Sequence, residues 1–235
     1  MEIVALIEKE KDYEKKKLLY SVYLNNKSFA ASKIQKDLLK GIIQAMSVID
    51  RKFFILEGDE DEAYVDQPIS IGYKQTISQP STVAKMLLLA ELKKGQDVLE
   101  VGSGSGWAAA LISYLIFPGK LVSIERLAPL SEFARKNVNN LPDKVKSKMN
   151  YEFLFGNGLN PKHTIWKTGY DRVVVAAAGS EDLIKNLKKI ANLKDNGLIL
   201  FPTSIGNLEL WESKKGKLQV EHVEEGYAFV PLVEE

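Results

Sequence analysis

Residues 98–107 read VLEVGSGSGW, an apolar strand pattern that turns directly into a glycine-rich loop. The stretch 108–115 that follows is rich in Ala and Leu, which is typical of a buried helix. Gly102, Gly104 and Gly106 allow a tight turn and the close approach of a ligand to the backbone, while the helix offers free N–H groups and its positive end. The stretch therefore predicts a strand–loop–helix unit that binds a nucleotide-like cofactor.

The spacing of the glycines separates two classes of cofactor loop. A dinucleotide fingerprint, G-x-G-x-x-G, would place its third glycine at position 107, but that residue is Trp107 and the glycine comes one position early. This spacing is similar to the loop of methyltransferases. Glu125 ends the next apolar run, 19 residues after Gly106, where a carboxylate can accept hydrogen bonds from both hydroxyls of a ribose. NAD binding and a plain structural turn are the weaker alternatives, and Trp107 either packs in the core or contacts the cofactor.

Short apolar runs alternate with helical stretches over the rest of the chain. Strands are predicted at 98–101, 121–124, 151–155, 173–176 and 198–201, and helices at 107–116, 128–140 and 181–191. This alternation predicts an α/β fold with a doubly wound, mainly parallel sheet of the Rossmann-like kind. Beyond Pro202, the segments 207–212 and 227–232 have strand character with no helix between them, which predicts an antiparallel end to the sheet.

The chain length favours one domain over residues 1–235, divided into an N-terminal helical and substrate-side segment, 1–80, and a cofactor-binding α/β core, 81–235. The charged run 8–17 is predicted to be the solvated part of an N-terminal helix. A second helix is indicated by apolar residues at helical spacing, which form one stripe. These are Ile34, Leu38, Leu39, Ile42, Ile43 and Met46.

The composition excludes several classes of function. Lys and Arg number 32 against 31 Asp and Glu, so no overall charge recruits nucleic acid or an anionic membrane. The absence of cysteine excludes disulfides, thiolate metal sites and cysteine nucleophiles. No run approaches the roughly 18 apolar residues of a membrane-spanning helix, and the N-terminal sequence has no secretory core, so a cytoplasmic protein is expected. The oligomeric state cannot be predicted.

Several stretches before and after the glycine loop match a known family in order and spacing. They read LKGIIQAM at 39–46, DRKFF at 50–54, AYVD at 63–66, IGYKQTISQP at 71–80 and YAFVPL at 227–232. Together with the glycine loop they resemble the protein-L-isoaspartate (D-aspartate) O-methyltransferases over roughly residues 38–232. The order and spacing of these pieces make the resemblance specific.

The resemblance implies methyl transfer from S-adenosylmethionine to the free α-carboxylate of L-isoaspartyl residues in damaged proteins and peptides, which initiates their repair. Ser78 would place the substrate carboxylate beside the transferred methyl group, and the backbone of Val230 would contact the substrate. Thr76 and Ile77 would close over the cofactor. The remaining cofactor-binding residues would be Glu100, Gly102, Ser103, Gly104, Gly106, Glu125, Arg126, Asn157 and Gly158.

A carboxylate nucleophile makes a general base unnecessary, because its pKa of about 4 leaves it ionised at neutral pH. Neither His163 nor His222 lies in a catalytic spacing, and no metal is implied. The chain departs from the family pattern at three places: Ser81 replaces a histidine, Asn157 replaces an aspartate, and the stretch 179–182 lacks a usual proline. A cofactor-binding paralogue with weak catalysis, or a methyltransferase for another carboxylate or for RNA, are the alternative functions.

Overall fold

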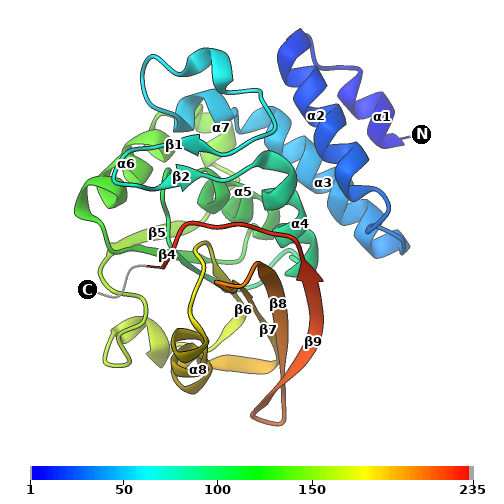
Figure 1. Ribbon diagram of the computed structural model, residues 1–235. Coiled ribbons are helices and arrows are strands. Elements are labelled where there is room, and N and C mark those ends of the chain that lie inside the picture. Colours follow the sequence, from blue (N-terminus) through cyan, green and yellow to red (C-terminus); the bar gives the residue numbers. More distant parts are fainter. Residues whose placement is uncertain (1, 233–235) are drawn as a thin grey trace.

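Figure 1 shows the computed structural model, which describes residues 2–232. Within these residues one sheet of seven strands runs in the order β5-β4-β3-β6-β7-β8-β9. The parallel strands are β3 (Val98–Val101), β4 (Leu121–Glu125), β5 (Tyr151–Phe155), β6 (Tyr170–Val175) and β7 (Leu193–Pro202). The antiparallel strands are β8 (Asn207–Lys214) and β9 (Lys217–Glu225). The predicted α/β fold is confirmed.

Helices cover both faces of this sheet because neighbouring residues of each strand point to opposite sides. Val98 is buried in the cluster that also holds α4 (Pro80–Leu89), α5 (Trp107–Ile116) and α6 (Ala128–Asn139). Leu99 is buried in the other cluster, together with α8 (Glu181–Ile190) and the 3₁₀ turn Thr164–Lys167. A short helix, α7 (Asp143–Lys146), precedes β5. The predicted helices 107–116, 128–140 and 181–191 are correct to within one residue.

The N-terminal helices α1 (Glu2–Ile7), α2 (Tyr13–Asn26) and α3 (Lys33–Val48) pack beside α4 and α5, at the upper right of Figure 1. The charged run 8–17 is not one solvated helix as predicted, because the chain turns between α1 and α2 and Lys15 is buried in an ion pair with Asp50, 3.0 Å between Nζ and Oδ2. In α3 the apolar stripe is buried from Leu39 to Met46, whereas Ile34 is 70% exposed.

Two short 3₁₀ turns, Arg51–Phe54 and Glu60–Glu62, lead from α3 to a small hairpin of β1 (Ile69–Ser70) and β2 (Thr76–Ile77). In Figure 1 this hairpin lies above the carboxyl ends of the parallel strands. The turn of the hairpin places two residues other than glycine, Tyr73 and Lys74, at φ +54° and +59°. Helix α4 then begins with Pro80, whose fixed φ suits a first helical position.

The last predicted strand is wrong. The segment 207–212 belongs to β8 as expected, but its partner is β9, and residues 226–232 form an extended strap that crosses the carboxyl ends of the parallel strands (Figure 1). Ala178 fixes this strap by donating its N–H to the carbonyl of Val230 and accepting the N–H of Leu232, each at 2.8 Å. The pattern of β9 was missed because an edge strand carries charged residues that mask its apolar alternation.

No helix within residues 2–232 combines the length and the apolar character that a membrane crossing requires.

Candidate active site

A cavity of about 870 Å³ opens at the carboxyl ends of β3, β4 and β6, where ligands bind in open α/β sheets. Its walls come from the glycine loop, the segment after β4, the turn after β5, the end of β6, the β2 strand and the strap. It brings together eleven of the residues expected from the sequence: Thr76, Ile77, Ser78, Gly102, Ser103, Gly104, Glu125, Arg126, Asn157, Gly158 and Val230. We call this the first cavity.

The glycine loop has a conformation that side chains would strain. Gly102 and Gly104 line the first cavity at φ +98° and +51°, which is the left-handed region that favours glycine. Gly106 is not in the cavity wall: a Cβ atom at this position would lie 3.1 Å from the backbone of Ala134 in α6. This glycine therefore allows the loop and α6 to pack closely, and its predicted contact with the cofactor is not supported.

Glu125 is held in a fixed orientation at the end of β4. Its Oε2 accepts the N–H of Gly104 at 2.9 Å and its Oε1 accepts the N–H of Leu127 at 3.0 Å. The carboxylate is 7% exposed and lies in the wall of the first cavity. Each carboxylate oxygen can accept a second hydrogen bond, so both remain able to receive a ligand hydroxyl.

Glu100 is not part of the wall of the first cavity, and its predicted contact with the cofactor stays a prediction. Its side chain is completely buried, and it accepts a hydrogen bond from the hydroxyl of Ser123. The Ser123 hydroxyl in turn lies 2.6 Å from that of Ser103 in the glycine loop. Burial raises the pKa of Glu100 to about 8, against the lowering effect of the Ser123 hydrogen bond, and the nearby charge of Glu125 raises it further. Glu100 is therefore largely neutral at pH 7, and it supports the glycine loop through Ser123 and Ser103.

Trp107 packs in the core, which is the first of its two alternatives, and its contact with the cofactor stays a prediction. Its side chain is 2% exposed and its Nε1 donates to the carbonyl of Ile49 at 3.1 Å, so most of the indole is core. The same residue also forms part of the wall of the first cavity.

Arg51 organises the segment that carries Ser78. Its buried guanidinium donates from Nη2 to the carbonyls of Gln67 at 2.8 Å and Ser78 at 3.2 Å, and from Nη1 to those of Ala63 and Val65. Burial lowers the pKa of Arg51 to about 10, which leaves it charged at neutral pH. Sequence reasoning gave Arg51 no role, although its position between two apolar stretches, 42–46 and 53–56, was a signal for burial.

A second cavity of about 1190 Å³ lies on the other side of Ser78. Thr76, Ser78 and Val230 belong to the walls of both cavities, so the two meet at these residues. The rest of the second wall comes mainly from the end of α2, the first turns of α4, the last residue of β9, Glu225, and the strap as far as Phe229. The contribution of α2 was not predicted, because the N-terminal segment carries no recognised motif.

The three departures from the family pattern have local explanations. Ser81 donates both its N–H, at 2.9 Å, and its hydroxyl to Asp66. Asn157 lines the first cavity and accepts the N–H of Leu159 at 2.8 Å. In place of a proline, Gly179 donates its N–H to the carbonyl of Pro202 at 3.0 Å, which ties the turn after β6 to the end of β7.

Comparison with known proteins gives a consistent result. The model of the protein-L-isoaspartate(D-aspartate) O-methyltransferase family matches residues 25–235. The protein-L-isoaspartate O-methyltransferase of Pyrococcus abyssi is 36% identical over 209 residues, which cover 83% of this chain and 90% of the relative. The one from Pyrococcus horikoshii is 33% identical and covers 98% of both chains.

A solved structure shows the same fold. A Plasmodium falciparum structure that bears the same enzyme name, in complex with S-adenosyl-L-homocysteine, superposes with a TM-score of 0.74 at 22% identity. The match covers 95% of this chain and 99% of that one, so the fold agrees from end to end.

Proposed function

The chain belongs to the protein-L-isoaspartate(D-aspartate) O-methyltransferase family, and on this premise we propose how its residues transfer a methyl group from S-adenosylmethionine to the free α-carboxylate of L-isoaspartyl residues in proteins and peptides. The observation that carries the proposal is the meeting of two cavities at Ser78. One cavity has polar groups that suit the cofactor, and the other would receive the peptide. Methyl transfer requires donor and acceptor to meet at one point, and the presence of Ser78 in both walls supports this residue as that point.

The placement of the polar groups in the first cavity suits S-adenosylmethionine. The glycine loop, the Glu125 carboxylate and the turn after β5 line this cavity together. We propose that Glu125 accepts the two ribose hydroxyls, since the N–H groups of Gly104 and Leu127 already fix its orientation. Gly102 and Gly104 would let the loop approach the amino-acid part of the cofactor, and Asn157 and Gly158 would lie against the adenine.

The bound cofactor supplies a methyl group on a positively charged sulfur. The protein has to hold the substrate carboxylate in line with that group and remove its water, and such alignment can lower a barrier by roughly 7–11 kcal/mol. We propose that the hydroxyl of Ser78 donates a hydrogen bond to one carboxylate oxygen and leaves the other free to attack. Arg51 is a positioning residue, because its guanidinium donates a hydrogen bond to the carbonyl of Ser78.

Val230 would bind the substrate through its backbone N–H, since its carbonyl already accepts the N–H of Ala178. Contacts of this kind recognise the peptide backbone and depend little on the side chains around the damaged residue. They suit an enzyme whose substrates are many different proteins.

The test uses two peptides that differ only in one L-isoaspartyl versus one L-aspartyl residue. Labelled methyl should pass from S-adenosylmethionine to the isoaspartyl peptide alone, as a base-labile ester. Cofactor binding without transfer to either peptide would contradict the proposal and favour the catalytically weak paralogue, for which the departures at Ser81 and Asn157 are the specific observations. Transfer to another small acid or to RNA would identify a different acceptor.

Ser78→Ala tests the role of this hydroxyl. We expect kcat to fall by about ten- to a hundred-fold, because a hydrogen bond to a charged group is worth roughly 1.5–3 kcal/mol. The dissociation constant of the cofactor, measured by calorimetry, should stay within about two-fold, because the proposed polar contacts of the cofactor lie elsewhere in the cavity. Unchanged turnover in the variant would remove Ser78 from the mechanism.

We further propose that the chain works as one domain in the cytoplasm on isoaspartyl proteins, without nucleic acid or membrane partners. One cluster of buried side chains extends from Ile7 in α1 to Leu210 in β8, which supports a single folding unit. The near balance of 32 basic and 31 acidic residues supports the absence of a polyanionic partner.

A further inference from the structure

Lys85 brings an unusual cation into the wall of the second cavity. Its side chain is only 12% exposed, and its ammonium lies 4.0 Å from the centre of the Phe29 ring. The nearest carboxylate is Glu224, at 3.8 Å from Nζ to Oε2, which is too long for a hydrogen bond. Among residues 2–232 the ammonium makes no hydrogen bond, although it has three N–H donors. A poorly solvated cation with spare donors is able to bind an anion.

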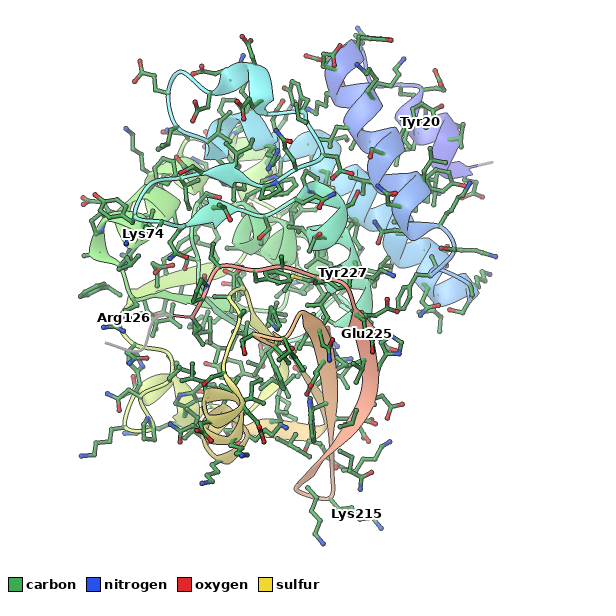
Figure 2. The ribbon with its side chains drawn as sticks, in the orientation of Figure 1. Tyr20, Lys74, Arg126, Lys215, Glu225 and Tyr227 are labelled. Atoms are coloured by element: carbon green, nitrogen blue, oxygen red, sulfur yellow. The ribbon has the colours of Figure 1, made fainter. Side chains whose placement is uncertain are left out.

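The other carboxylates near the second cavity do not remove the ability of Lys85 to bind an anion. Asp66 is saturated by the hydroxyls of Ser21 and Ser81, the backbone N–H of Ser81 and the amide of Asn25. Glu225 also lines the second cavity, but its side chain is exposed, so water and salt screen its charge more than that of Lys85. Figure 2 labels Glu225 and Tyr227, which lie where β9 passes into the strap and which both line the second cavity.

Asn26 adds a second unsatisfied group to the same wall. The residue is 1% exposed, and its Nδ2 donates to the carbonyls of Val22 at 3.0 Å and Ser81 at 3.1 Å. These two bonds fix the orientation of the amide, and its Oδ1 has no hydrogen-bond partner. A buried acceptor without a partner is costly. Because this atom is buried, a ligand does not reach it, and the group that the second cavity offers is the Lys85 ammonium, which suits a peptide with an acidic side chain.

We propose that the second cavity is a specificity subsite that prefers substrates with an aspartate or glutamate one or two residues from the isoaspartyl residue, and that Lys85 binds that carboxylate. The inference rests on the proposed function. Ser78 and Lys85 line the same cavity, so a peptide that places its isoaspartyl carboxylate at Ser78 and extends by about 3.3–3.6 Å per residue brings its neighbouring residues into this cavity. A carboxylate that approaches within hydrogen-bond distance would displace the longer contact with Glu224.

The experiment compares isoaspartyl peptides that carry Glu or Gln at each of the four positions from two residues before to two residues after the damaged site. The quantity measured is the Glu/Gln ratio of kcat/KM. At the best position we expect a ratio of about five to ten, since a half-buried ion pair exceeds an exposed one. Lys85→Met should bring this ratio close to one, whereas Lys94→Met, at an exposed lysine outside the cavity, should leave it unchanged.

For Glu224→Gln we predict a change of the Glu/Gln ratio in the opposite direction. It removes the anion that competes for Lys85, so the Glu/Gln ratio should rise above that of the wild type. This variant also keeps the proposal testable if Lys85→Met does not fold. A ratio near one at all four positions in the wild type, or a ratio that Lys85→Met leaves unchanged, would overturn the subsite.

A binding measurement separates this proposal from the proposed function. The dissociation constants of the same peptides are measured with the protein loaded with S-adenosylhomocysteine, so no turnover is needed. Glu-dependent binding that Lys85→Met abolishes, without methyl transfer to any peptide, would support the subsite and contradict the enzyme function. Methyl transfer to the isoaspartyl peptides with no Glu preference in turnover or in binding would contradict the subsite and support the enzyme function.

Discussion

Replacing Glu100 with Gln should change how the stability of the protein depends on pH. The pKa of this buried carboxyl is raised from 4.5 to about 8. Its folded-state pKa therefore lies above the unfolded one, so the native protein keeps a proton that the unfolded chain releases. The resulting stability is fully present below pH 4.5 and is lost as the pH rises towards 8, by about 1.4 kcal/mol per pH unit.

The magnitude follows from the width of this window. Between pH 5 and pH 8 the free energy of unfolding of the wild type should fall by about 3 kcal/mol through Glu100 alone. Glutamine has nearly the same shape and no proton to lose, so the variant lacks this component. The difference in unfolding free energy between Glu100→Gln and the wild type should therefore shift by about 3 kcal/mol in favour of the variant across the same range.

Urea unfolding at pH 5, 6, 7 and 8 measures this difference directly, in the absence of cofactor. The absolute stability of the variant is a separate quantity, because the new amide brings N–H donors into a site built around Ser123. Glu132→Gln, at an exposed position in α6, is the matched control and should run parallel to the wild type. The same pH dependence for Glu100→Gln and the wild type would refute the assignment of a raised pKa to Glu100.

Three further substitutions test other parts of the site. Glu125→Gln should weaken cofactor binding by about ten- to a hundred-fold in calorimetry, because the hydroxyl hydrogen bonds lose their charged acceptor; an unchanged dissociation constant would show that the ribose does not bind there. Gly106→Ala should lower the free energy of unfolding by about 1–3 kcal/mol, since φ is +86° and the new Cβ would lie 3.1 Å from Ala134; urea unfolding at wild-type values would contradict this. Lys74→Gly should raise the melting temperature slightly, because φ is +59° and relief of a left-handed residue is worth at most about 1–2 kcal/mol; a lower melting temperature would count against strain in this turn.

Much of the fold could be predicted because its signals are local. The strand 98–101, the glycine loop and the helix from Trp107 follow from the switch between apolar, glycine-rich and helical patterns. The strap could not be predicted in the same way. Residues 227–232 are apolar enough for a strand, but their partner is a single bridge to Ala178, and such a long-range pairing leaves no periodic signal.

The same distinction between local and long-range signals applies to the residues of the candidate site. The place of Glu125 in the cavity wall was predictable because it depends on the distance of this residue from the glycine loop along the chain. The burial of Glu100 depends on Ser123, and the need for a glycine at position 106 depends on α6. Both partners are distant in sequence. Arg51 contacts four carbonyls between residues 63 and 78, and no spacing rule relates an arginine to backbone acceptors.

The position of the strap has a kinetic consequence. Val230 belongs to the walls of both cavities, while Figure 2 labels Lys74 and Arg126 on one side of the molecule and Glu225 and Tyr227 towards the other. Arg126 lines the first cavity and Tyr227 lines the second, so we expect donor and acceptor to enter and leave by separate openings. Neither has to wait for the other, so we expect random-order binding and product inhibition by demethylated cofactor that competes with the methyl donor and not with the peptide. A long protein with several damaged residues could then stay engaged while the spent cofactor is exchanged.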